Sequence, residues 1–381
     1  MSEQASERLS LTEHFSVLKD PRVERTKRHS LNDIVVMTIC AVICGADSWV
    51  AVEEFCKAKL SWFKTFLDLP SGIPSHDTFG RVFAALDPEQ FGRCFASWLS
   101  AVGRTLKGQV VAIDGKTLRR SFDNAADVAA IHMVSAWAVQ AHVVLGQVKT
   151  EEKSNEISAI PALLKKLELS GCIVTIDAMG CQRAIVKDIV ERSADYVICL
   201  KGNQGTMHDE VRQLFDWAQR DNFKELSHAY YESIDKGHGR IETRRYWTTG
   251  EVDWFEDRAK WAGLASFAMV ESERVVGEQT SVERRYFISS LSGGDAKQMA
   301  EAIRGHWGIE NELHWVLDVA FREDDCRVRV GYAAQNFSLL RQLALSLLKR
   351  ETSAKVGVKN KRLKAGWDEK YLLKVLSAAD L

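Results

Sequence analysis

The 381-residue chain is 46% hydrophobic and 27% charged, and its 51 Lys and Arg residues nearly balance 52 Asp and Glu residues, for a net charge of −1. This length allows two or three domains with a substantial core. The balance of charge excludes a polycation, so any contact with nucleic acid must come from local basic patches. Such patches occupy residues 19–28, 236–245 and 355–364. Each alone is more typical of a solvated face, but three in one chain favour a binding role.

The chain begins without a charged and then apolar segment, so the sequence predicts no signal peptide. The longest apolar run, residues 34–46, is too short to span a bilayer and predicts a buried helix. The eight cysteines include no C-x-x-C pair, which indicates neither a zinc site nor a disulfide framework and favours a reducing compartment. We therefore expect a cytoplasmic protein that does not bind membranes.

Residues 1–108 predict an all-helical N-terminal domain. The run "LNDIVVMTICAVICG" (31–45) is an apolar helix with a Gly stop, and "SWVAVEEFCKAKLSWFKTFL" (48–67) has apolar residues at helical spacing. The stretch "GIPSHDTFGRVFAAL" (72–86) contains a loop and then a Ser/Asp helix start. Short helices around a tight turn fit a helix-turn-helix and a plain helical bundle equally well, so both interpretations stay open.

From residue 109 the pattern changes to that of an α/β protein. Short apolar runs are typical of strands buried on both faces. Their order with the intervening helices (strand, hairpin, helix, strand, helix, strand) predicts a mixed sheet covered by helices. The expected strands are 110–114, 132–150 (a hairpin), 172–178 and 194–202, and the expected helices are 156–169, 181–193 and 206–220. Residues 109–227 thus form the first part of the core.

The remaining residues divide into three parts. Residues 228–293 predict a β-rich, basic insertion of twisted antiparallel strands with exposed arginines, in which Gly237 and Gly239 permit a tight hairpin tip. A long helical region begins at Asp295, so residues 294–350 are expected to return to the core. Residues 351–381 are polar and basic and predict a mobile tail.

Two of the predicted buried strands end in the same way. The segments "VVAIDGKTLRR" (110–120) and "CIVTIDAMG" (172–180) each run from apolar residues into an Asp and then a small residue, at Asp114 and Asp177. Active groups gather beyond the carboxyl ends of strands in open α/β sheets, so we expect these carboxylates to meet. Each Asp alone could equally cap the turn that follows it.

A third carboxylate, Glu310, lies in "HWGIENELHWVLD" (306–318), on a helix whose apolar residues recur every three or four positions. This spacing places Glu310 on a largely inward-facing stripe, where an unpaired carboxylate is costly. Glu310 therefore either pairs with Arg304, His306 or His314, or joins the two aspartates.

Three carboxylates that meet must take up protons or hold cations. At about 4 Å and an effective dielectric near 20, each like-charge pair costs roughly 4 kcal/mol. Ligands that are all oxygen favour Mg²⁺, with Mn²⁺ as a substitute, over zinc. Two such ions would stabilise the entering and leaving oxygens of a phosphoryl transfer. Asp114, Asp177 and Glu310 are therefore the candidate metal ligands and catalytic residues.

Six segments together make the chain resemble the DDE transposases of bacterial insertion sequences, in the branch of the H-repeat-associated proteins. They span roughly residues 20–350 and read "AIDGKTLRRS", "TIDAMGCQ", "YVICLKGNQ", "GHGRIETRRYW", "RGHWGIENELHWVLDVAFREDDCRVR" and "QNFSLLRQLALSLLK". The resemblance implies an RNase H-like core, a mixed sheet flanked by helices, interrupted by a β-rich insertion before the last acidic helix. It also implies that Asp114, Asp177 and Glu310 are the first, second and third acids.

The resemblance implies the reaction as well. Water would cleave double-stranded DNA at an element end to leave a 3′-hydroxyl, which would then attack target DNA, without a covalent enzyme intermediate. A homodimer on paired ends is expected from the resemblance alone. The wider superfamily often has a Tyr and an Arg before the third acid and a Lys after it. Here His306 and Trp307 stand nearby and no Lys follows within the helix, so Arg304 is the substitute considered for phosphate contact.

Basic and polar residues near the acids, in the insertion and in the N-terminal segment are candidate DNA contacts, most of them to phosphates. Surface solvation is the alternative for each of them. The N-terminal domain is the part to which we assign recognition of element ends. The candidates are Arg22, Arg25, Lys27, Arg28, Lys116, Arg119, Arg120, Lys201, Asn203, His238, Arg240, Arg244, Arg304 and His306.

Other interpretations stay open. A nuclease of the same fold would cut DNA without strand transfer, an inactive relic would bind DNA without cutting it, and a plain α/β protein would use its carboxylates only as caps. A strand-transfer assay separates a transposase from a nuclease. Terminal inverted repeats on both sides of the gene would distinguish a mobile element from a stranded copy.

Overall fold

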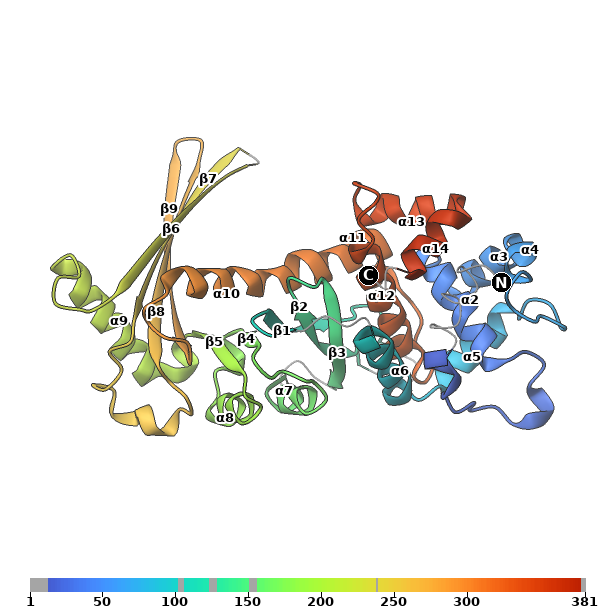
Figure 1. Ribbon diagram of the computed structural model, residues 1–381, viewed down its shortest axis with the longest axis horizontal. Coiled ribbons are helices and arrows are strands. Elements are labelled where there is room, and N and C mark those ends of the chain that lie inside the picture. The colour runs from blue at the N-terminus through green and yellow to red at the C-terminus, as the bar shows by residue number, and fades with distance from the viewer. Residues whose placement is uncertain (1–12, 102–105, 123–128, 151–155, 238, 378–381) are drawn as a thin grey trace.

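The computed structural model describes residues 13–101, 106–122, 129–150, 156–237 and 239–377. These residues form an elongated mixed α/β molecule, with a helical body at one end and a long mixed sheet that reaches the other (Figure 1). Within the described residues, no helix is long and apolar enough to cross a membrane.

Helices from both ends of the chain build the helical body (Figure 1). After the 3-10 turn η1 (Glu24–Thr26), its N-terminal helices are α2 (Leu31–Ile43), α3 (Trp49–Ala58), α4 (Leu60–Phe63), α5 (His76–Ala85) and α6 (Pro88–Ala101). The side chains of Ser30, Ser48 and Ser75 accept a hydrogen bond from the backbone N–H three residues further on, which satisfies a donor that the helix itself leaves unpaired. The apolar helix α2 is almost entirely buried, as predicted.

Residues 358–367 and 369–377 form helices that pack on the body, so the prediction of a mobile tail is wrong for this part of the chain. The helices that complete the body are α12 (Ala333–Arg350), α13 (Val358–Trp367) and α14 (Glu369–Ser377). The basic sequence concealed this fold because Lys361 and Arg362 are buried and donate hydrogen bonds to backbone carbonyls. Buried cations are tolerated when they are paired and hydrogen-bonded in this way.

Nine strands form one sheet in the order β3-β2-β1-β4-β5-β9-β8-β7-β6. Strands β1, β4 and β5 are parallel, whereas β2 and β3 form an antiparallel hairpin beside β1. This confirms the mixed sheet predicted from the sequence. The bounds of these strands are β1 (Val110–Thr117), β2 (His132–Ala138), β3 (Val143–Thr150), β4 (Ile173–Ile176) and β5 (Asp195–Leu200).

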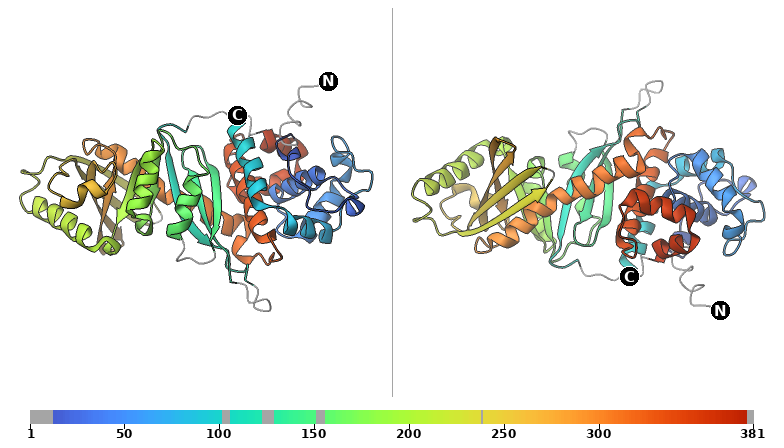
Figure 2. Two further views of the ribbon diagram at one scale, coloured as in Figure 1. Left: turned by 90° about the horizontal axis from the view of Figure 1, so that it is seen from below. Right: turned by 90° about the horizontal axis from the view of Figure 1, so that it is seen from above.

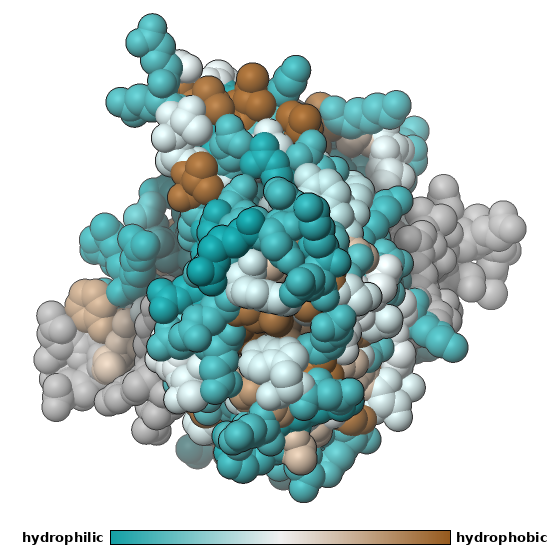
Figure 3. Space-filling view, turned by 90° about the vertical axis from the view of Figure 1, so that its left-hand side faces the viewer, coloured by the Kyte–Doolittle hydropathy of each residue, from teal (hydrophilic) through white to brown (hydrophobic). Residues whose placement is uncertain are grey.

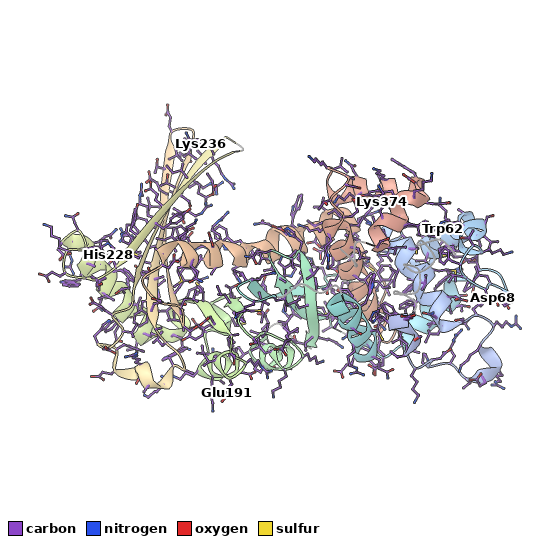
Figure 4. All side chains as sticks on the ribbon, in the orientation of Figure 1. Trp62, Asp68, Glu191, His228, Lys236 and Lys374 are labelled. Carbon is purple, nitrogen blue, oxygen red and sulfur yellow. The ribbon has the colours of Figure 1, made fainter. Side chains whose placement is uncertain are left out.

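Four further strands, which we call the ribbon, extend the same sheet. They are β6 (Ala229–Gly237), β7 (Arg240–Thr249), β8 (Ser266–Val276) and β9 (Gln279–Ser289). Strand β9 pairs antiparallel with β5, so the ribbon continues the sheet instead of forming a detached unit. Its outer half projects beyond the helices, with Lys236 at the tip and His228 near the base (Figure 4).

The insertion at residues 228–293 carries no net positive charge, which corrects the expectation of a basic insertion, whereas Arg240, Arg274 and Arg284 are exposed as expected. Residues 228–293 contain nine Lys and Arg against eleven Asp and Glu. Glu232, Arg245, Glu271 and Arg284 lie opposite one another across the four strands. Successive members of this row are ion-paired at 3.1, 3.3 and 2.9 Å, because residues opposite one another on neighbouring strands share a face. Figure 3 shows this end as largely hydrophilic, with apolar residues gathered near the top.

Helices cover both faces of the sheet (Figure 2). One face carries α7 (Glu156–Leu164), α8 (Arg183–Glu191) and α9 (Gly205–Arg220), and α10 (Ala296–Gly308) crosses the other face. Helix α10 packs closely on β1 at Gly305, where a Cβ atom would lie only 3.0 Å from Cγ1 of Val110. This close approach brings the residues after α10 to the sheet near β1.

We expect Gly305→Ala to be less stable than Gly308→Ala. Ala favours a helix interior over Gly by about 1 kcal/mol. At Gly308 the new methyl group meets Val139 at an ordinary 3.4 Å, whereas at Gly305 it presses on Val110. Urea titration should therefore give free energies of unfolding that differ by about 1 kcal/mol between the two variants. Equal values would contradict the close packing of α10 on β1.

Candidate active site

Asp114 lies within β1, which continues to Thr117, and Asp177 directly follows the neighbouring parallel strand β4. The pairing of β1 with β4 places Ile113 opposite Ile176, and Asp114 and Asp177 are the residues that come next in the chain. Asp177 also caps the 3-10 turn η3 (Ala178–Gly180), where its carboxylate accepts a hydrogen bond from the Met179 N–H at 3.0 Å. Asp177 thus has the capping role considered from the sequence and stands beside Asp114 as well.

Glu310 lies on a single π-helical turn, η6 (Ile309–His314), between α10 and α11 (Trp315–Phe321). A π turn has more residues than an α turn, so the 3.6-residue spacing does not carry through it. Glu310 is exposed and lines a cavity together with Asp177. The inward-facing position expected from helical spacing is therefore wrong.

The three acids lie within electrostatic reach of one another. Burial is the main cause that raises the pKa of Asp114 to about 7, and the charges of Asp177, Glu310 and Glu156 act in the same direction. Among the described residues, however, no three Asp, Glu, His or Cys side chains are close enough to form a metal site as they stand. The acids are therefore gathered oxygen donors and not a preformed metal cage.

His314 is the nearest basic group to Asp114, with its Nδ1 atom 3.6 Å from Oδ2 of the carboxyl. Burial, together with the positive charge of Lys116, lowers the pKa of His314 to about 3. The imidazole is therefore neutral at neutral pH. Sequence reasoning considered His314 as a partner of Glu310, but the π turn directs it to Asp114 instead.

A buried acid–base pair lies next to Gly115. His132 Nε2 and Glu156 Oε1 are 2.6 Å apart, and both side chains are almost fully buried. A Cβ atom at position 115 would collide with both groups, so the small residue after Asp114 makes room for this pair. Sequence reasoning missed His132 and Glu156 because no local pattern places either residue beside Gly115.

A cavity of about 330 Å³ opens beside Asp177 and Glu310. Its basic lining residues come from the loop after β5, from two strands of the ribbon and from α10, and they are Lys201, Arg244, Arg285 and Arg304. The guanidinium carbons of the three arginines lie 5.8, 5.1 and 4.9 Å from the ring centre of Trp307. The ribbon thus reaches the site that carries two of the acids.

Sequence reasoning missed Arg285, although strand alternation contained a signal. Arg285 precedes Phe287 by two residues in β9, and Phe287 packs with α10 residues on one face of the sheet. Alternate residues of a strand share a face. An assignment of Phe287 to the face of the sheet that α10 covers would therefore have placed Arg285 on the same face.

Two family models match the chain. The model described as DDE_Tnp_1-associated matches residues 12–99, and the model described as Transposase DDE domain matches residues 105–347. The chain belongs to the DDE transposase family. The second match alone covers more than half of the chain and includes the positions of all three acids.

The curated relatives agree with this family and confirm the resemblance to the H-repeat-associated branch. "Putative transposase YncI" of Escherichia coli O157:H7 is 43% identical to this transposase over 373 residues, which are 97% of this chain and 95% of that protein. "H repeat-associated putative transposase YhhI" of Escherichia coli K12 is 40% identical over 376 residues, 97% and 98% of the two chains. "Inactive transposase YbfQ" of the same strain is 44% identical over 72 residues, 19% and 86% of the two chains.

The basic residues that follow Asp114 in this transposase contact acidic side chains of α11 and of the 3-10 turn η7 (Glu323–Asp325) that follows it. Lys116, Arg119 and Arg120 each lie near a different carboxylate, at 2.6, 3.1 and 3.9 Å respectively. The partners are Asp318, Asp324 and Asp325. Their charges are thus partly neutralised within the chain, which weakens the sequence-based assignment of these residues to DNA phosphates.

Three other predicted contacts lie around the cavity. Lys201 is exposed at its lining, and His306 also lines it, with Nδ1 3.2 Å from the Thr175 hydroxyl. Burial lowers the pKa of His306, so its ring favours the neutral form. Asn203 donates a hydrogen bond to the Ala178 carbonyl at 2.6 Å and therefore fastens the loop after β5 to the turn that Asp177 caps.

The N-terminal candidates lie in the helical body, at the opposite end of the molecule from the ribbon (Figure 1). Arg22 is paired with Asp20 at 2.8 Å, and Lys27 is paired with Glu24. Arg25 and Arg28 are exposed. The fold does not bring these residues to the three acids, so any DNA that they contact must extend along the molecule.

The remaining candidates belong to the ribbon. Arg240 stands at the start of β7, beside the hairpin tip, and is 3.9 Å from Glu242. Arg244 is almost fully buried and is ion-paired with Asp235 and Glu242. His238 lies outside the described residues. Arg244 thus lines the cavity beside Asp177 and Glu310, whereas Arg240 does not.

Proposed function

We propose that this DDE transposase cleaves double-stranded DNA at the ends of an insertion element and joins the exposed 3′ ends to target DNA. Asp114, Asp177 and Glu310 are the proposed catalytic residues. The observation that carries the proposal is the approach of these three acids, two from adjacent parallel strands and one from the π turn, with the electrostatic effect of two of them on the third. The strand order β3-β2-β1-β4-β5 supports an RNase H-like core.

The donor set fits a divalent cation. Carboxylate oxygens are the ligands that Mg²⁺ prefers, and Mn²⁺ substitutes for it. Burial and the neighbouring acids raise the pKa of Asp114, so a bound cation would favour its charged form. Asp114, Asp177 and Glu310 would hold the ions, which when bound activate water and neutralise charge on the phosphate.

The other residues of the site orient the acids and the DNA. The Met179 N–H fixes the Asp177 carboxylate, and Asn203 holds the adjoining turn. Lys201 and Arg304 take part in no ion pair among the described residues, so they are available to contact phosphate oxygens. We further propose that the helical body recognises element ends and that two copies act on paired ends.

A cleavage and strand-transfer assay tests the proposal. Purified protein, Mg²⁺, a duplex carrying the inverted repeat that flanks the gene, and a supercoiled target should give cut ends with a 3′-hydroxyl and joined products. Glu310→Gln should lower the cleavage rate constant by ~1,000-fold, about 4 kcal/mol in activation free energy. The control is Glu301→Gln, because Glu301 is exposed on α10 and its ion pair with Lys297 is long, at 4.0 Å.

The products separate the alternatives. Cut ends without joined products would identify the protein as a nuclease that lacks strand transfer. DNA binding without cut or joined products would identify it as an inactive relic. Full activity of Glu310→Gln would reject Glu310 as the third acid.

A further inference from the structure

Four basic side chains, Lys201, Arg244, Arg285 and Arg304, line the cavity beside Asp177 and Glu310. Arg244 and Arg304 act on each other as like charges, and burial together with Arg244 lowers the pKa of Arg304. Gathering cations in a partly buried site is unfavourable unless an anion compensates them. The two acidic lining residues, Asp177 and Glu310, are proposed metal ligands, so their charge would be neutralised by the ions.

Arg244 retains an unused donor in this site. Its side chain is 3% exposed, and its terminal nitrogens are paired with Asp235 and with Glu242, the latter at 2.5 Å. Its Nε atom is buried and has no hydrogen-bond partner. A buried donor without a partner is destabilising in the free protein.

Trp307 brings the guanidinium groups together. Arg285 from β9 and Arg304 from α10 lie 5.1 and 4.9 Å from the centre of its ring, within the range of cation–π attraction. Arg285 is paired with Glu283 at 2.8 Å, which sets the direction of its side chain, and the charge of Glu310 acts on it. Two consecutive elements of the chain, β9 and α10, thus present planar cations to one cavity.

We propose that Arg244, Arg285 and Arg304, arranged around Trp307, bind a DNA phosphodiester adjacent to the one that is cut. Guanidinium groups bind phosphate oxygens through paired, charge-assisted hydrogen bonds. The ribbon therefore forms part of the cleavage site and positions the DNA strand there. This inference rests on the proposed cleavage of DNA, and it adds a second phosphate site beside the three acids.

Neutral backbone substitution tests the contact. Single-turnover cleavage is measured on the inverted-repeat duplex, with one methylphosphonate placed at each phosphate near the cut in either strand. Arg285→Ala should lower the rate constant about 10- to 100-fold on unmodified DNA. A methylphosphonate at the contacted phosphate should slow cleavage by the wild type by a similar factor. The same methylphosphonate should not slow cleavage by Arg285→Ala any further, because the contact is already lost. The strand that carries this position identifies which DNA strand occupies the pocket.

Three further variants separate a contact from a change of structure. Arg285→Lys should recover part of the rate because it keeps the charge. Cleavage by Arg304→Gln should likewise be insensitive to that methylphosphonate. This variant is suitable because its substitution leaves no carboxylate without a partner. Arg258→Ala, in the 3-10 turn η5 (Glu256–Lys260) and paired only with Asp253, should cleave like the wild type.

Binding gives a second readout. With the cleavage-deficient Glu310→Gln background, Arg285→Ala should reduce the slope of log affinity against log salt by about one. The phosphate pocket would be overturned if every methylphosphonate slowed cleavage by the same factor in Arg285→Ala as in the wild type, and if the slope of log affinity against log salt were the same in both proteins. Failure of the wild type to cut any of these duplexes would instead reject the proposed function.

Discussion

Asp114→Asn is expected to abolish DNA cleavage and to stabilise the metal-free protein at pH 8. In the folded protein the pKa of Asp114 is raised from 3.8 to about 7. A raised carboxyl pKa means that folding disfavours the charged form of Asp114. The contribution of this group to the free energy of unfolding is therefore fully present below about pH 4 and is lost as the pH rises through 7. The loss is at most ~4 kcal/mol, and Asn avoids it because its side chain is neutral.

Urea unfolding at pH 4 and pH 8 with a chelator measures this difference. The free energy of unfolding of Asp114→Asn should exceed that of the wild type by about 2 to 4 kcal/mol at pH 8. At pH 4 the two free energies should differ little. Added Mg²⁺ should stabilise the wild type at pH 8 and affect the variant less. Asp209→Asn, on the exposed side of α9, is the control. Parallel stability curves for the wild type and Asp114→Asn would contradict the electrostatic contact among the three acids.

Arg362→Ala is expected to destabilise the protein by about 3 to 5 kcal/mol, because it removes a large buried side chain and leaves two backbone carbonyls without their donor. Arg362 is 4% exposed, and its guanidinium group donates to the carbonyls of Val42 and Ala320 and to the Asp47 carboxylate. It also lies 4.0 Å from the ring centre of Phe321. One side chain of α13 thus joins α2 to α11, the helix that follows Glu310.

Urea unfolding of Arg362→Ala should show this loss, and DNA cleavage should fall because α11 supports the π turn that carries Glu310. Lys359→Ala, on an exposed position of the same helix, should change the free energy of unfolding by less than about 0.5 kcal/mol. A similar small change for Arg362→Ala would show that the C-terminal helices do not hold the helical body together.

Much of the fold and of the acid constellation is readable from local sequence. The buried helix at residues 31–43, the strand that leads to Asp114 and the hairpin at residues 132–150 were predicted, because apolar spacing depends only on near neighbours. Two strands that each end on an Asp also indicated adjacent carboxylates. Their register in the sheet agrees with that prediction.

Charge patterns misled the prediction wherever their partners were remote in the chain. The tail looked mobile because Lys361 and Arg362 suggested solvent, although backbone carbonyls and Asp47 receive them. The ribbon looked basic because each arginine was considered without the glutamate on the neighbouring strand. The position of Glu310 was misassigned because a single π turn leaves no mark on apolar spacing.

The sequence by itself determined the types of element, the order of the acids along the chain and the family. Only the tertiary structure decided which charges meet: Lys116 with Asp318, Arg362 with Asp47, and three arginines around Trp307. The physical reason is range. Helix and strand patterns arise from residues a few positions apart, whereas most of these contacts depend on strand register and helix packing that join residues tens to hundreds of positions apart.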